Sequence, residues 1–216
     1  MAPIYHELGL TTSNTFYDPP RAALVSDHVG GTAKNIEAAF EKAKGGVLFI
    51  DEAHALNGGR HDPYGQEATT AILVNAEKHK NDTVVILAGY PEEMAAFMRT
   101  DPGLSSRFPT PIHFPNFSVK ELETIAVRKL TSADYDLGRG TLPLIKSAAV
   151  QIHAKPVSGN ARDVRNLFDK VLEAQSTRLA SHPNPSPDDL RQIKAEDIRY
   201  AMAALGTPPP PRRKYT

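Results

Sequence analysis

The stretch that decides the fold is Gly45–Leu56, GGVLFIDEAHAL, in which four apolar residues run directly into two adjacent carboxylates. The four apolar residues, 47–50, leave no polar face, and this is typical of a strand buried on both sides in the centre of a parallel α/β sheet. Ligands of such sheets bind beyond the carboxyl ends of the strands. Asp51 and Glu52 are therefore expected at the ligand-binding edge of a sheet.

On pattern alone, these two carboxylates admit two interpretations. Phosphoryl-transfer enzymes place an aspartate and a glutamate in this way to hold Mg²⁺ and to orient the attacking water. Asp51 would then bind the ion, directly or through a water, and Glu52 would be the base. In the second interpretation both carboxylates only solvate the loop. The string DEAH also occurs in a helicase family, but the nucleotide-binding loop and the Ser-Ala-Thr motif of that family do not occur in this sequence.

A second apolar run, TVVILAGY at 83–90, predicts another strand. The segment QEATTAILVNAEKHKND between the two runs has the length and spacing of a helix, so strand, helix and strand form a βαβ unit with parallel strands. A further helix is predicted before the first strand, with Thr32 as its N-cap and the pair Gly45-Gly46 at its end. The first half of the chain is thus predicted to be α/β.

After residue 117 the pattern becomes helical. Ser118 and Glu121 form a capping-box pattern that opens a helix, and three more helical segments are expected near 142–154, 160–181 and 194–205. We therefore predict an α/β subdomain over 1–117, a small all-helical domain over 118–205, and an extended Pro-rich basic tail over 206–216.

Two regions have weaker patterns. MAPIYHELGL predicts a short helix, and the prolines at 19 and 20 argue against a strand in TFYDPP. The segment 91–108 is expected to form a short helix, a Pro-Gly break and a loop, and PIHFP a brief extended segment.

Composition limits the classes of function. The 216 residues carry 25 basic and 25 acidic side chains, so the overall charge does not favour nucleic acid or an anionic membrane as a partner. There is no cysteine, which excludes disulfides and thiolate metal sites. No apolar run approaches the roughly 18 residues that span a bilayer. These observations predict an intracellular, cytoplasmic protein with neither a nucleic-acid nor a membrane partner.

Three longer stretches carry a family resemblance: LVSDHVGGTAKNIEAAFEKAKGGVLFIDEAHAL, then YGQEATTAILVNAEKHKNDTVVILAGYPEEMAAFMRTDPGLSSRFPTPIHFPNFS, then SGNARDVRNLFDKV. Together they resemble the AAA+ ATPase subgroup that contains the red-type Rubisco activase and stage V sporulation protein K, from about residue 1 to 205. The resemblance implies a partial parallel sheet with flanking helices, a helical lid, binding of ATP with Mg²⁺, a ring of six subunits, and ATP-driven remodelling of a protein substrate that the sequence does not identify.

The resemblance also implies roles for residues of the first half. Asp51 and Glu52 correspond to the Walker B pair, with Asp51 as the Mg²⁺ residue. Tyr90 stands at the position of the sensor residue in the wider superfamily. Arg107 corresponds to the arginine finger, which places a cation in the neighbouring subunit's site. The subgroup commonly has two arginines here, and this chain has Ser105 at the first.

Further roles come from the same comparison of motifs. Arg162 resembles the sensor arginine of the lid, with Arg165 as the alternative. His28, Val29 and Gly30 fall where the central-pore loop lies, and His28 stands where the family usually has an aromatic residue. An imidazole offers less apolar area than an aromatic ring for gripping a polypeptide, and it is titratable.

The phosphate-binding loop G-x-x-x-x-G-K-[ST], which should precede these motifs, does not occur in the sequence. We expect the chain to begin just after that loop. Two hypotheses follow: the chain is part of an AAA+ ATPase whose function belongs to the complete module, or it is a degenerate AAA+ relative that binds partners or ring neighbours and hydrolyses nothing. On either hypothesis the chain by itself is predicted to be a poor ATPase.

Overall fold

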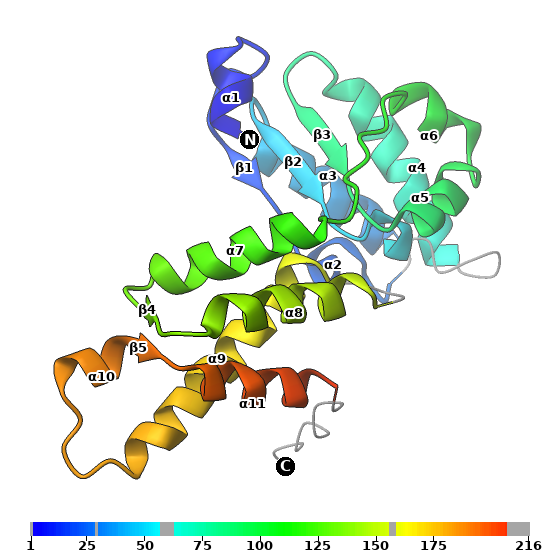
Figure 1. Cartoon of the computed structure of the whole chain (residues 1–216). Helices are drawn as coiled ribbons and strands as arrows, with labels where there is room; N and C mark the ends of the chain where they lie inside the picture. Colours follow the sequence, from blue (N-terminus) through cyan, green and yellow to red (C-terminus); the bar gives the residue numbers. More distant parts are fainter. Residues whose placement is uncertain (1, 29, 57–62, 156–158, 207–216) are drawn as a thin grey trace. The chain divides into compact units, whose positions relative to one another are not determined.

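The computed structural model describes residues 2–28, 30–56, 63–155 and 159–206. The contacts within the chain divide it into Met1–His113, here called unit 1, and Phe114–Thr216, here called unit 2. Unit 1 is α/β and unit 2 is mainly helical (Figure 1). No helix within the described ranges is long and apolar enough to cross a membrane. The predicted tail lies outside the described residues, apart from Gly206.

Unit 1 is built on a parallel sheet with the strand order β1-β2-β3 (Figure 1). The strands are β1 (Phe16–Tyr17), β2 (Val47–Ile50) and β3 (Val84–Leu87). β2 pairs with both of the others, and Ile50 lies opposite Leu87. The predicted parallel pair is thus confirmed. β1 corrects the expectation that the prolines prevent a strand, because they follow the two paired residues.

Helices surround this sheet in chain order. They are α1 (Ala2–Glu7), α2 (Arg21–Leu24), α3 (Gly31–Ala43), the 3₁₀ helix η1 (Ala53–Leu56), α4 (Pro63–Lys78), α5 (Pro91–Met98) and α6 (Pro102–Arg107). The segment expected as a loop after the Pro-Gly break is therefore a helix, α6. It forms because Asp101 caps it, its carboxylate accepting a hydrogen bond from the Gly103 N–H at 2.7 Å, and because Pro102 fits the first helical position.

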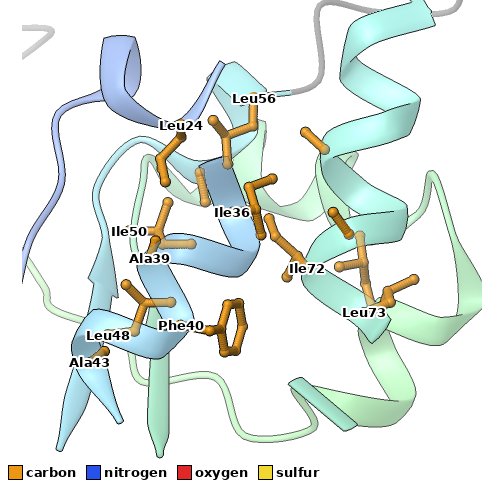
Figure 2. Packing of buried hydrophobic residues seen from close by; sticks show 14 of the residues in the cluster. Leu24, Ile36, Ala39, Phe40, Ala43, Leu48, Ile50, Leu56, Ile72 and Leu73 are labelled. Carbon is orange, nitrogen blue, oxygen red and sulfur yellow. The ribbon is translucent and has the colours of Figure 1, made fainter. Parts of the chain in front are cut away.

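The core of unit 1 lies between α3, α4 and one face of β2. Figure 2 shows Ile36 and Phe40 of α3, Ile50 of β2 and Ile72 of α4 in one cluster, and all four are fully buried. Full burial of a large apolar side chain contributes about 1.5–3 kcal/mol. This cluster holds β2, and with it the two carboxylates that follow β2, on a rigid support.

The opposite face of the sheet is less covered. Phe49 is half-buried, and its ring lies 5.8 Å from that of Phe16, which is 47% exposed. All four residues of β3 are half-buried as well. The expectation of burial on both sides is thus met by three of the four residues of β2 but not by Phe49, because Phe49 points away from the cluster that buries Leu48 and Ile50.

The start of α3 also differs from the prediction. The N-cap is Gly30, with φ at +79°, and not Thr32. The Thr32 hydroxyl is buried and accepts a hydrogen bond from the Ser26 N–H at 3.0 Å. Glycine takes this left-handed conformation without strain, so the chain turns into the helix two residues earlier than expected.

Unit 2 contains four long helices and two short elements that pair. The elements are α7 (Val119–Thr131), β4 (Asp136–Leu137), α8 (Thr141–His153), α9 (Ala161–Ala180), α10 (Pro187–Arg191), β5 (Gln192–Ile193) and α11 (Ala195–Leu205). The capping box at Ser118 is confirmed: the Ser118 hydroxyl accepts from the Glu121 N–H, and the Glu121 carboxylate accepts from the Ser118 N–H. The parallel pair β4–β5 was not predicted, because two residues show no periodicity.

The core of unit 2 is a second closed cluster. Each long helix contributes at least two buried side chains, among them Leu122 of α7, Ile145 of α8, Val164 of α9 and Ile198 of α11. The fold class is therefore as predicted, a partial parallel sheet with flanking helices followed by a small, mainly helical unit.

Candidate functional site

The candidate site lies where β2 and β3 end. Beyond the strands the two chain segments stay together: the Ala88 N–H donates to the Ile50 carbonyl, and the Ala53 N–H donates to the Ala88 carbonyl, both at 2.9 Å. Residues 51–52 and 89–90 therefore follow their strands at the same edge of the sheet. We call this the carboxyl edge. Ligands of open parallel sheets bind at such an edge.

Asp51 is exposed at the carboxyl edge. One of its carboxylate oxygens, Oδ1, accepts a hydrogen bond from the Glu52 N–H at 3.0 Å. Mg²⁺ is typically bound by one or two carboxylates together with waters and substrate phosphates. In the described part of the chain no group of three or more His, Asp or Glu side chains could hold a metal ion. The residues present therefore fit a hydrated Mg²⁺ shared with a phosphate, and not an all-protein cage.

Glu52 adopts an uncommon backbone conformation, with φ at +50°. A non-glycine residue in the left-handed region costs on the order of 1–2 kcal/mol, and such strain is found mainly at functional sites. The Glu52 carboxylate lies 3.5 Å from Nε2 of His54 in η1. Its position is thus set both by the turn after β2 and by a neighbouring imidazole.

His54 is a residue that the sequence reasoning missed as part of this site. Its Nδ1 is buried and has no hydrogen-bond partner among the described residues. A Cβ added at Gly89, just after β3, would lie 2.7 Å from this Nδ1, so the close packing of the imidazole requires a glycine there. The only sequence signal was the histidine of the DEAH string, which by itself did not indicate a contact with Glu52.

Tyr90 occupies the N-cap position of α5, and its side chain is 52% exposed. The Tyr90 carbonyl accepts a hydrogen bond from the Met94 N–H at 2.8 Å. The structure therefore places Tyr90 at the carboxyl edge, one residue beyond the glycine that packs on His54.

Arg107 ends α6, and its Nε lies 3.6 Å from a Glu77 carboxylate oxygen of α4. Glu77 also accepts a hydrogen bond from the Lys80 ammonium at 2.6 Å. The hydrogen bond and charge of Lys80 lower the pKa of the Glu77 carboxyl, and Arg107 adds a smaller effect of the same sign. Ser105 is exposed and donates to the Met98 carbonyl at 3.3 Å. No contact between described residues joins Arg107 to the carboxyl edge.

The segment before α3 presents His28 to solvent. The His28 N–H donates to the Ser26 hydroxyl at 3.2 Å, and its carbonyl accepts from the Gly31 N–H at 3.0 Å. Gly30 turns the chain into the helix, and Val29 lies outside the described residues. The predicted pore-loop position is thus a short turn with an exposed imidazole.

Arg162 and Arg165 lie in the first turns of α9, and both are exposed. Neither makes an ion pair with another residue in the described part of the chain. They belong to unit 2, whereas Asp51, Glu52 and Tyr90 belong to unit 1.

Comparison with known proteins identifies the family of this architecture. Residues 4–116 match the family model "ATPase family associated with various cellular activities (AAA)", and residues 118–206 match the AAA lid domain. The chain therefore belongs to the AAA family, and its two halves are the family's ATPase-type domain and lid domain.

Relatives and solved structures agree with this membership. The chain is 33% identical over 207 residues to stage V sporulation protein K of Bacillus subtilis (strain 168), covering 94% of this chain and 64% of that protein. It is 34% identical over 210 residues to protein CbbX of Cereibacter sphaeroides, covering 95% of this chain and 68% of that protein. The FIGL-1 AAA domain in complex with ADP shares the fold, with a TM-score of 0.62 and 20% identity over 88% of this chain and 62% of that one. The resemblance found in the sequence is thereby confirmed.

Proposed function

We propose that this chain is the ATP-processing part of an AAA+ ATPase that forms a ring and remodels a protein substrate. The observation that supports the proposal best is the pair Asp51 and Glu52, which follows β2 at the carboxyl edge in a chain of the AAA family. ATP and Mg²⁺ are the cofactors that this family membership favours.

In this proposal each residue of the edge has a distinct task. Asp51 orients the hydrated Mg²⁺ through the carboxylate oxygen that does not accept from Glu52. Glu52 accepts a proton from the attacking water, and His54 keeps its carboxylate in place. Bound Mg²⁺ supplies charge that stabilises the transferred phosphoryl group. Tyr90 lies beside these groups and contacts the nucleotide end of the site.

The remaining roles act across subunits or domains. Arg107 serves as the arginine finger, which requires that it leave Glu77 and enter a neighbouring subunit's site. Arg162 binds the nucleotide from the lid, with Arg165 as the alternative. The loop of His28, Val29 and Gly30 contacts the protein substrate.

The missing phosphate-binding loop limits what this chain does alone. That loop provides backbone amides, a lysine charge and a Mg²⁺-binding hydroxyl, and none of its signature occurs in the 216 residues. Micromolar ATP affinity corresponds to about 8 kcal/mol, an amount that losing these groups together is able to cancel. We therefore expect low ATPase activity from the chain by itself.

A second candidate is a pseudo-ATPase that assembles with partners and hydrolyses nothing. Ser105, which stands where relatives commonly have a first arginine, favours this candidate together with the absent loop. The intact pair Asp51 and Glu52 favours the first, since a protein without hydrolysis does not need a base.

The direct test is titration calorimetry with Mg·ATP. We expect the chain alone to bind ATP with a Kd on the order of millimolar or weaker, and expect micromolar binding after a P-loop segment with its preceding strand is joined to the N-terminus. Asp51→Ala in the joined protein should weaken Mg·ATP binding at least about 10-fold, and Asp18→Ala, which removes an exposed carboxylate after β1, should not. ATP binding that is equally strong in the Asp51 variant contradicts the proposed Mg²⁺ site.

A further inference from the structure

The helix α3 begins without a side-chain cap of its own. Its N-cap residue is Gly30, which has no side chain to accept from the first amides of the helix. A helix start leaves four backbone N–H groups without intrahelical partners, and these must be satisfied from elsewhere. The question is what holds this turn, which ends the exposed segment of His28.

A carboxylate from another helix supplies the cap. Glu67 lies in the second turn of α4, and its two oxygens accept from two amides at the start of α3: Oε2 from the Gly30 N–H at 3.3 Å and Oε1 from the Ala33 N–H at 2.9 Å. Both contacts are partly buried. A negative charge is favoured at a helix N-terminus, and hydrogen bonds to a charged acceptor are the stronger kind. We call this pair of contacts the Glu67 clamp.

Local contacts hold the other side of the same turn. Ser26 donates its N–H to the Thr32 hydroxyl at 3.0 Å and accepts at its own hydroxyl from the His28 N–H at 3.2 Å. A Cβ at Gly31 would lie 2.3 Å from the Ser26 hydroxyl oxygen, so this approach requires glycine. The turn is thus held from one side by Ser26 and from the other by α4, and His28 is left exposed between them.

The clamp also leads back to the carboxyl edge. α4 packs on η1, the short helix that carries His54, through buried Leu56 of η1 and Ala68 of α4, members of one core cluster. Ala68 directly follows Glu67. A shift of η1 relative to β2 would therefore reach the start of α3 through a packed helix and a charged hydrogen-bonded contact.

We propose that Glu67 is the positioning residue of the turn at 27–30 and that it holds this turn in the conformation that binds an extended polypeptide. The second part rests on the substrate-binding role proposed above for this loop. Glu67 does not itself need to touch the polypeptide, because it acts through the backbone of Gly30 and Ala33. The positioning part stands on the measured contacts alone.

The matched control is Glu37→Gln. Glu37 lies on α3 and accepts from Lys78 of α4 at 3.0 Å, so it joins the same two helices at a place away from the turn. Glu67→Gln removes the charge and one acceptor, and Glu67→Ala removes both acceptors. Urea unfolding of each variant identifies any loss that is merely global.

The first readout is amide exchange measured by NMR on the full chain. We expect the Ala33 amide to lose protection about 10-fold in Glu67→Gln and more in Glu67→Ala, with no change in Glu37→Gln. Unchanged protection of Ala33 in both Glu67 variants overturns the positioning role.

The second readout is the binding of fluorescein-labelled casein, an unfolded polypeptide, measured by anisotropy. We expect Glu67→Gln and His28→Ala each to weaken casein binding about 5-fold or more, and Glu37→Gln to leave it unchanged. If Ala33 responds but casein binding does not, the inferred effect of the clamp on polypeptide binding is wrong. If the unaltered chain binds no casein, or if His28→Ala has no effect, the proposed substrate-binding loop fails while the clamp itself stands.

Discussion

The two units bury their apolar residues in different ways. In unit 2 each of the four long helices places several side chains in one closed cluster. In unit 1 the face of the sheet toward α3 and α4 is equally closed, but β3 has no fully buried residue and Phe16 is 47% exposed on the other face. The helical unit is thus covered within its own sequence, whereas the sheet has one covered face and one partly open face.

This difference locates the stability of unit 1. The rigid support for Asp51 and Glu52 is the covered face, because Leu48 and Ile50 of the same strand are buried there. The open face contributes less to folding, since its residues keep part of their contact with water. Substitutions on the two faces should therefore have unequal effects.

The largest effect is expected on the covered face. Phe40→Ala removes a fully buried ring of α3 and should lower the free energy of unfolding of unit 1 by about 3–5 kcal/mol. Hydrogen exchange followed by mass spectrometry should show faster exchange in β2 and unchanged exchange in α9. An equal loss of protection in both units would mean that the two cores are not separate cooperative units.

A smaller effect is expected from the polar anchor of unit 2. Arg178 donates two hydrogen bonds to Asp197, which is 1% exposed, and one to the Gln192 carbonyl. Arg178→Met would leave the buried carboxylate without its cation and should lower the unfolding free energy of unit 2 by about 2–3 kcal/mol.

The control for this variant is Lys170→Met, which breaks an exposed ion pair with Glu173 on the same helix. Exposed pairs contribute little, so no measurable change is expected. Urea denaturation of both variants, followed by the signal of unit 2, gives the comparison. Equal losses in the two variants would contradict the anchoring role of Arg178.

The helix cap at Ser118 should contribute less, and its contribution should depend on pH. Ser118→Ala is expected to destabilise unit 2 by about 1 kcal/mol at pH 7. The hydrogen bonds from Ser118 lower the pKa of Glu121 below its ordinary value of 4.5. A lowered pKa in the folded state gives stability that is fully present above about pH 4.5 and is lost as the pH falls through the folded-state pKa.

The difference between the unaltered chain and Ser118→Ala should accordingly shrink between pH 6 and pH 3, measured by thermal unfolding. Ser132→Ala at the other end of the same helix is the control, because its hydroxyl makes only a 3.5 Å contact with the Lys129 carbonyl. A difference that grows as the pH falls would have the wrong sign for this cap.

The smallest effect is expected on the open face of unit 1. Phe16→Ala removes a ring that stacks on Phe49 at 5.8 Å but is half exposed, and it should cost about 0.5–1 kcal/mol. The measurement is the urea midpoint of unit 1, compared with that of Phe40→Ala. A loss as large as that of Phe40→Ala would show that the open face is as important to the fold as the covered one.

The sequence predicted those parts of the fold that have local or periodic signals. The apolar runs predicted β2 and β3 and their parallel pairing, and Ser118 with Glu121 predicted the start of α7. The pattern failed where the deciding contact is not periodic: Asp101 capping α6, Gly30 opening α3, and the two-residue pair β4–β5.

The candidate site divides in the same way. The position of Asp51 and Glu52 at the end of a buried strand followed from the sequence. The contacts of His54 with Glu52 and of Glu77 with Arg107 did not, since they join residues whose spacing carries no helical or strand signal. The roles of Tyr90, Arg107, Arg162 and the 28–30 loop in catalysis or binding remain predictions.

The measurement that tests the central claim most directly is single-turnover ATP hydrolysis by the chain joined to a P-loop segment, comparing the unaltered protein with Glu52→Gln. The account predicts that Glu52→Gln lowers the rate at least about 100-fold while ATP affinity changes little, because Glu52 is the base. Glu93→Gln, which removes an exposed carboxylate in the first turn of α5, should leave the rate unchanged. Hydrolysis that is equally fast in Glu52→Gln, or tightly bound ATP that is never hydrolysed by the unaltered protein, would contradict the account.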